Sequence, residues 1–215
     1  MLNNILSSAL ISHFSRIAKY FPPGKDKIAV IKALAATSLG YTTIYNGFFS
    51  DYFVAPQVKT YMNPMALVLD IPNEFAPIPG SGDVPVTFTH TFDIAKYVVA
   101  LQSLPKWEKE SFIIGDKVTL NEFVRLAEQA KGKKFTVVHD SLEKLRSGRI
   151  TELPSHPAMY PFFPKPMLQG FFAAFGVMFE QGAFDLDVRG SLTERFPEIK
   201  PRKIKALLEE AYGRT

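Results

Sequence analysis

Apolar positions recur along the chain at intervals that alternate between helical and strand-like spacing. Residues 25–36 carry apolar side chains every three to four positions, which predicts a helix, and 41–49 is rich in Thr, Ile, Tyr and Phe, which favours a strand. By the same criteria we predict further strands at 66–71, 86–90, 112–114 and 134–139, and helices at 93–102, 120–130, 141–146 and from Pro201 onward.

Local signals place several boundaries of these elements. Thr119 and Glu122 form a capping box, because the Thr hydroxyl and the Glu carboxylate can satisfy free amides in the first turn of a helix. Pro201 suits a first-turn position of the last helix. The segment 80–82, Gly-Ser-Gly, predicts a turn because Pro85 and a strand-like run follow it instead of a helix.

The alternation of helices and strands predicts an α/β fold with a largely parallel sheet, built around strands 41–48 and 112–114. Such sheets bind nucleotides at the carboxyl ends of their strands, usually through a glycine-rich turn that leads into a helix. The 215 residues contain no such turn. The sequence therefore predicts a nucleotide-type sheet without its phosphate-binding element.

The first 21 residues predict an amphipathic helix. Apolar side chains recur at helical spacing, and the other face holds Asn, Ser, Arg16 and Lys19. A mitochondrial presequence has similar features, but a single Arg favours a packed helix. The other apolar stretch, 167–179, is too short to cross a bilayer, so no membrane association is expected.

The amino-acid composition argues against several classes of function. The chain is 47% hydrophobic and has a net charge of +4, but its basic residues are scattered among acidic ones, so no nucleic-acid partner is expected. With no cysteine, a disulfide framework and a thiolate nucleophile are excluded, and a reducing, cytoplasmic location is expected.

Local motifs for catalysis or metal binding are sparse. None of the eight tyrosines has a Lys four residues later, which excludes the Tyr-x-x-x-Lys pair of ordinary short-chain dehydrogenases. The histidines lie far apart in sequence, so structural roles are expected for them and no metal site, although convergence in the fold stays open: His13, His90, His139 and His156.

Five segments carry a resemblance to a known family. The sequence from residue 25 to the end resembles the carboxyl-terminal part of NmrA-like proteins, in the isoflavone-reductase-like branch of the atypical short-chain dehydrogenases, and most of all their members in filamentous fungi. Residues 1–23 do not match, and the glycine-rich amino-terminal half of the family's Rossmann unit has no counterpart. The segments are GKDKIAVIKALAATSLGYTTIYNGFFSDYF, VPVTFTHTFDIAKYVVAL, ESFIIGDKVTLNEFVRLAEQAKGKKFTVVHDSLEKL, ITELPSHP and FPEIKPRKIKALLEE.

The resemblance implies a partial NAD(P)-binding Rossmann-like sheet, with NADP as the cofactor. It places the family's catalytic lysine at Lys27, in a pattern whose usual base is replaced by Ile31, and a lysine ammonium there could neutralise the charge left by hydride transfer. The nicotinamide-binding strand end falls on Asn46, Gly47 and Phe48. Without the resemblance, Lys27 reads as a surface lysine and 46–48 as an ordinary strand end.

The resemblance also implies a small-molecule substrate site. A wall of this site is expected at Phe49 and Tyr52, and the aromatic segment 160–184 adds Tyr160 and Phe171, although such segments also form plain core. We expect an amphipathic helix over 1–24, the remainder of the Rossmann-like domain over 25–130 and a mainly helical substrate-binding lobe over 131–215.

Two functions remain open at this point. One is an NAD(P)-dependent reductase of a small aromatic or conjugated metabolite, of the kind used in secondary metabolism, here shortened and deficient in cofactor binding. The other is a non-catalytic NmrA-like regulator or ligand-binding protein. In either case the amino-terminal helix or a second subunit of a homo-oligomer is expected to cover the sheet edge left by the missing strands.

Overall fold

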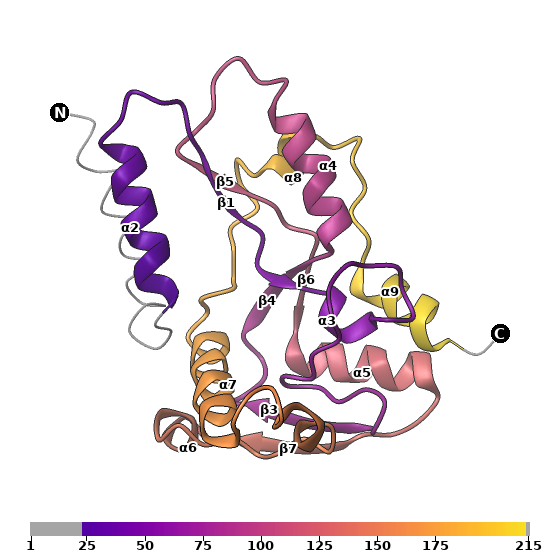
Figure 1. The fold of residues 1–215 in the computed structure, drawn as a ribbon. Helices are drawn as coiled ribbons and strands as arrows, with labels where there is room; N and C mark the ends of the chain where they lie inside the picture. The colour runs from indigo at the N-terminus through magenta and orange to yellow at the C-terminus, as the bar shows by residue number, and fades with distance from the viewer. Residues whose placement is uncertain (1–22, 214–215) are drawn as a thin grey trace.

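The computed structural model describes residues 23–213 of the chain (Figure 1). The helix predicted over 1–24, and its expected contact with the sheet edge, fall almost entirely outside the described residues. The first described element is helix α2 (Pro23–Ala35), which confirms the prediction for 25–36. It stands to one side of the strands in the ribbon, and Ile31 packs against Tyr45, Ile114 and Leu186.

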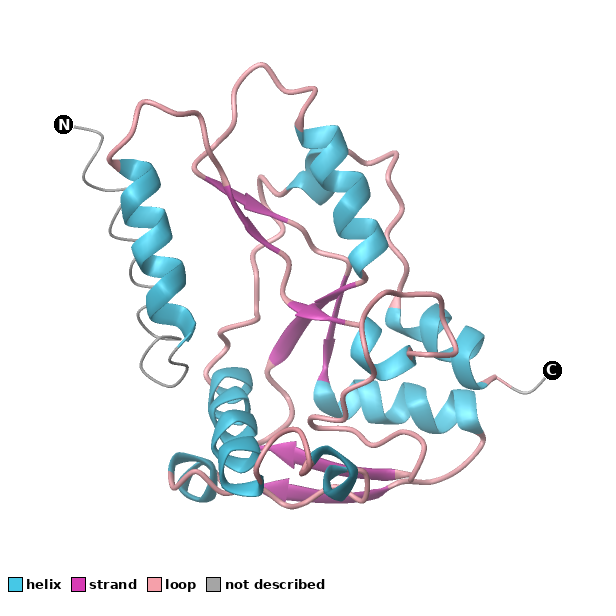
Figure 2. Cartoon of the chain, viewed as in Figure 1, coloured by secondary structure: helices cyan, strands magenta, loops and turns pink. Residues whose placement is uncertain are grey.

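Short strands in the middle of the molecule confirm the α/β prediction (Figure 2). Strand β1 (Thr43–Tyr45) pairs in parallel with β5 (Glu110–Phe112). Strand β2 (Phe48–Phe49) pairs in parallel with β4 (Pro85–Thr89), which also pairs antiparallel with β6 (Asp116–Thr119). The single strand predicted over 41–49 is thus two strands, and the one predicted at 112–114 lies two residues earlier.

A separate two-stranded sheet joins β3 (Phe75–Pro79) in parallel to β7 (Thr136–Asp140). The sequence pattern does not predict β3, because Pro77 and Pro79 argue against a strand. The structure accommodates both, since the backbone N of Gly80 bonds to Asp140 O and the alternating prolines direct their nitrogens away from β7. Proline is tolerated here because β3 is an edge strand of this sheet.

The prediction of a strand at 66–71 is wrong. This segment is buried but forms only an isolated bridge between Asp70 and Phe75. Its carbonyl groups bond to side chains instead of a neighbouring strand: Ala66 O contacts His156 Nε2 at 3.1 Å, and Ile71 O accepts from Lys131 Nζ at 2.7 Å. A buried backbone must be hydrogen-bonded, but side chains can do it as well as a strand.

Most predicted helices are confirmed. They are α4 (Thr91–Leu101), α5 (Leu120–Lys131) and α6 (Leu142–Arg146). The aromatic segment contains a further helix that was not predicted, α7 (Lys165–Glu180). Thr119 Oγ1 accepts from Glu122 N at 3.0 Å, as the capping box predicts. Short helical turns complete the chain: α3 (Asp51–Val54), η1 (His156–Met159) and α8 (Leu192–Arg195).

The last helix, α9 (Ile204–Tyr212), begins three residues later than predicted. Pro201 precedes the helix instead of occupying its first turn. The start is set by Asp116 of β6, whose Oδ2 accepts from Ile204 N at 2.9 Å. A carboxylate from a distant strand therefore caps this helix, and no local sequence signal could show it.

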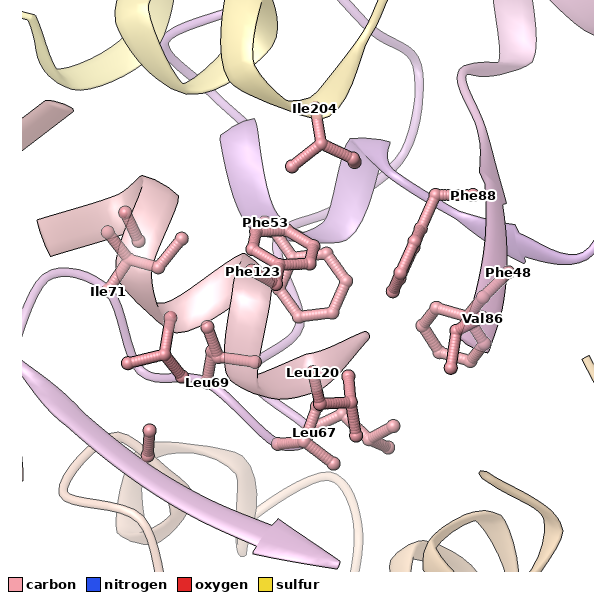
Figure 3. Close-up of a cluster of buried hydrophobic side chains, with 14 of the residues drawn as sticks. Phe48, Phe53, Leu67, Leu69, Ile71, Val86, Phe88, Leu120, Phe123 and Ile204 are labelled. Atoms are coloured by element: carbon pink, nitrogen blue, oxygen red, sulfur yellow. The ribbon is translucent and has the colours of Figure 1, made fainter. Parts of the chain in front are cut away.

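The main hydrophobic core lies between β4, α5, α9 and the 67–71 segment (Figure 3). Phe53 and Phe123 have ring centroids 4.9 Å apart, and Phe88 and Phe123 5.1 Å apart. Helices α6 and α7 lie together at the carboxyl ends of β3 and β7. Among the described helices, none combines the length and apolar character that a membrane span requires.

Candidate functional site

The carboxyl ends of three strands are tied together by one threonine. Thr89, the last residue of β4, donates from Oγ1 to Asn46 O after β1 at 2.8 Å and accepts from Gly115 N after β5 at 3.1 Å. In α/β sheets this edge is where ligands bind. The hydrogen bonds of Thr89 hold the backbone of this edge in one arrangement without a ligand.

Gly47 is required for this shape. Its φ of +69° lies in the left-handed region, and a Cβ added there would be 2.1 Å from Thr87 O. Asn46 on its one side is half-buried, with Nδ2 donating to Gly47 O at 3.3 Å. Phe48 on the other side is only 5% exposed, so its backbone and not its ring can face a cofactor.

Lys27, the predicted catalytic residue, lies in the amino-terminal half of α2. This helix runs antiparallel to β1, so that half points toward the carboxyl end of the strand (Figure 1). Lys27 is exposed, and its side chain makes no hydrogen bond or ion pair with any other described residue. Ile31, one turn later, packs on Tyr45, so Lys27 lies one turn away from a residue that contacts β1.

A continuous run of aromatic rings links this strand end to α7. Phe49 contacts Tyr52, which contacts Phe48, with centroids 5.9 and 5.6 Å apart. The run continues from Phe48 to Phe175 at 5.6 Å, and from there through Phe171 to Phe163 at 5.0 and 5.9 Å. Three predicted substrate residues thus come together here: Phe49, Tyr52 and Phe171.

Tyr160 lies just before Phe163 in a polar group that the sequence did not suggest. Its hydroxyl donates to Glu152 Oε1 at 2.5 Å, and Lys165 Nζ donates to the other carboxylate oxygen. Burial, followed by Glu152, raises the pKa of Tyr160, whereas the bond from Lys165 lowers the pKa of Glu152. The phenol is therefore neutral and the carboxylate ionised at neutral pH.

A second polar network lies wholly inside the protein. Asp51 is buried, and its carboxylate accepts from Thr91 N and Oγ1 at 2.9 and 2.6 Å. His90 is equally buried, with Nε2 3.5 Å from Asp51 Oδ1 and Nδ1 2.6 Å from Arg202 Nη2. Because Nδ1 also accepts from Phe92 N, the ring proton belongs on Nε2.

The sequence alone does not indicate this network, because its members are far apart in the chain. The only local signal is His90 directly before α4, where its ring caps the helix. Burial, the largest effect, lowers the pKa of His90, opposed by Asp51 and reinforced by Arg202. Among the described residues, no group of three or more His, Asp or Glu side chains could hold a metal ion.

Comparison with known sequences gives proteins named oxidoreductases. The chain is 36% identical over 178 residues to oxidoreductase BOA1 of Botryotinia fuckeliana (strain B05.10), covering 81% of the chain and 55% of that protein. It is 34% identical over 218 residues to oxidoreductase swnN of Metarhizium robertsii, covering 98% of the chain and 63% of that protein. The chain therefore spans less than two thirds of the length of these relatives. No family model matches the sequence.

Comparison with solved structures gives proteins with the same α/β fold, which include an epimerase and reductases. An isoflavone reductase superposes with a TM-score of 0.66 at 15% identity, over 88% of the chain and 58% of the reductase. AtPrR2 with NADP+ and (+)-pinoresinol superposes with a TM-score of 0.60 at 19% identity, over 86% of the chain and 56% of AtPrR2. The protein thus has the α/β fold of isoflavone-reductase-like proteins, and its sequence relatives are named oxidoreductases.

Proposed function

We propose that this chain forms the substrate-binding part, and the nicotinamide-facing edge, of an NADP-dependent oxidoreductase that reduces a small aromatic or conjugated metabolite. The observation that carries the proposal is the run of rings from Phe49 to Phe163, which begins at the strand edge expected to face a nicotinamide. Phe49, Tyr52 and Phe163 are half-buried, so they keep surface for a flat apolar ligand.

The residues at the strand edge suit the nicotinamide end of NADP. Asn46 Nδ2 is an amide donor with one hydrogen engaged by Gly47 O, which leaves one for a cofactor carboxamide. Lys27 is a cation without a described partner on the helix beside the strand. When bound, NADPH would supply the hydride, and Lys27 would stabilise or protonate the anionic centre that remains on the substrate.

The 215 residues offer no binding element for the pyrophosphate end of NADP, because they contain no glycine-rich turn. The 80–82 segment is a turn between β3 and β4, as expected, and not a phosphate loop. We therefore propose that the 215-residue chain alone binds NADPH no tighter than roughly 1 mM, or about 4 kcal/mol. A micromolar dissociation constant by calorimetry would contradict this part of the proposal.

A second candidate is a non-catalytic protein that binds a ligand or partner through the same lobe. A cytoplasmic location, a role in secondary metabolism, and a homo-oligomer that covers the free edge of β1 belong to both proposals. Light scattering tests the oligomer, since a monomer at micromolar concentration would exclude it.

The substrate site can be tested directly with 2-naphthol as a flat aromatic probe. Calorimetry should detect binding to the purified chain, weakened about fivefold or more by Phe49→Ala and by Tyr52→Ala, because each removes a ring contact of about 1 kcal/mol or more. Val99→Ala is the control, since Val99 is an exposed apolar residue of α4 outside the ring run. Equal affinity in all variants would contradict the proposed site.

A further inference from the structure

The aromatic run ends at Phe163, which lies in sequence between two partners of one carboxylate. Phe163, its last ring, stands three residues after Tyr160 and two before Lys165. Glu152 joins both neighbours, accepting from the Tyr160 hydroxyl and from the Lys165 ammonium. One negative and one positive charge therefore compensate each other beside an apolar surface.

This group keeps hydrogen-bonding capacity and access. The side chains of Glu152 and Lys165 are 34% and 48% exposed, and the ammonium lies 5.5 Å from the centre of the Tyr160 ring. A carboxylate offers about four acceptor positions and an ammonium three donors, so both can still bond to a ligand. The flanking apolar residues Phe162 and Met167 are 89% and 59% exposed.

We propose that Glu152, Tyr160 and Lys165 form a charge-compensated end of the substrate site, which accepts a neutral polar group and discriminates against charged ones. The inference rests on the proposed function, because it takes the substrate to lie along the ring run. A ligand hydroxyl can donate to Glu152 and accept from Lys165. A ligand carboxylate is repelled by Glu152, and a ligand ammonium is repelled by Lys165. Neutralising either residue leaves the charge of the other without compensation.

An experiment that neutralises each charge in turn tests this inference. Calorimetry on the full chain compares three probes with the same ring system: neutral 2-naphthol, anionic 2-naphthoate and cationic 2-naphthylmethylamine. The wild-type chain should bind 2-naphthol about two- to fivefold more tightly than either charged probe and show little preference between those two. Glu152→Gln should favour 2-naphthoate over the amine about fivefold, and Lys165→Gln should favour the amine to a similar degree.

Controls separate this effect from a general change in charge or stability. Lys205→Gln and Glu209→Gln change the same charges in an exposed pair of α9, 3.8 Å apart, and should leave the preferences unaltered. Tyr160→Phe keeps the ring but removes the hydroxyl that donates to Glu152, so the carboxylate gains a free acceptor position and 2-naphthol should bind about two- to fivefold more tightly.

Two outcomes contradict the inference in different ways. If 2-naphthol binds and depends on Phe49 but the Glu152 and Lys165 variants keep the wild-type preference, the charge-compensated end is wrong and the proposed function stands. If no probe binds the wild-type chain at millimolar concentration, the substrate site itself is wrong, and the inference is rejected with it.

Discussion

Arg202 and His90, separated by 111 intervening residues, meet inside the protein, where Arg202 Nη2 lies 2.6 Å from His90 Nδ1. Arg202 N also donates to Asp93 Oδ2 at 2.8 Å. These bonds hold the segment before α9 against the start of α4. Since Asp51 faces the other side of the His90 ring, the same network reaches α3, the short helix that follows the predicted nicotinamide-binding strand end.

Stability should therefore fall in mild acid. Burial lowers the pKa of both His90 and His156 in the folded protein, so the unfolded chain takes up these protons first. Their contribution is complete above the unfolded pKa of about 6.5 and is lost as the pH falls below it. Urea unfolding at pH 7.5 and 5.5 should show a loss of at most about 1.4 kcal/mol per pH unit for each histidine.

His90→Gln provides the check on this pH dependence. It should reduce stability at pH 7.5 by about 1–3 kcal/mol, because Arg202 and Phe92 N lose their acceptor, and it should make the pH profile flatter. His139→Gln is the control, because His139 is exposed. A profile as steep in His90→Gln as in the wild type would show that other groups cause the loss.

Gly47→Ala should be strongly destabilising, by about 2 kcal/mol or more, since the new Cβ meets both a left-handed backbone and Thr87 O. Gly148→Ala is a matched control, with φ of +75° but open space around its Cβ. This substitution should lower the free energy of unfolding by only about 1–2 kcal/mol, the cost of placing a Cβ on a left-handed backbone. Chemical denaturation measures both, and equal losses would mean that the close approach to Thr87 relaxes without cost.

Phe48→Ala should cost about 3–5 kcal/mol, because the buried ring contacts Phe179 and Phe184 at 5.3 and 5.7 Å in addition to the substrate run. Phe162→Ala removes the same side chain from a position that is 89% exposed and should change stability by less than about 0.5 kcal/mol. A small loss for Phe48→Ala would contradict its place at the centre of the aromatic cluster.

The role proposed for Lys27 requires a fusion that supplies a complete cofactor-binding half from a relative. In an active fusion, Lys27→Ala should reduce turnover about 100- to 10,000-fold, with little change in NADPH affinity, because it removes the group that stabilises or protonates the substrate anion. Lys32→Ala, in the same helix and also exposed, should have a small effect. Similar effects of both substitutions would make Lys27 an ordinary surface lysine.

The sequence by itself determined the elements whose signals are local. Apolar spacing identified α2, α4 and α5, and the Thr119 hydroxyl marked the start of α5 because a cap acts within one turn. β-Branched and aromatic residues identified β4 and β7 in the same way. The resemblance added the strand end at Asn46, which no local pattern distinguishes from an ordinary loop.

Only the tertiary structure decided features whose partners are distant in the chain. Residues 66–71 have the composition of a strand, yet the side chains of His156 and Lys131 hydrogen-bond to carbonyl groups of this segment. Strand β3 forms in spite of its two prolines, because only the edge of β3 without the proline nitrogens pairs with β7. Asp116 moves the start of α9 to Ile204. The His90–Arg202 contact and the group around Glu152 likewise depend on segments brought together by folding, because hydrogen-bond partners and burial are properties of the packed chain and not of local spacing.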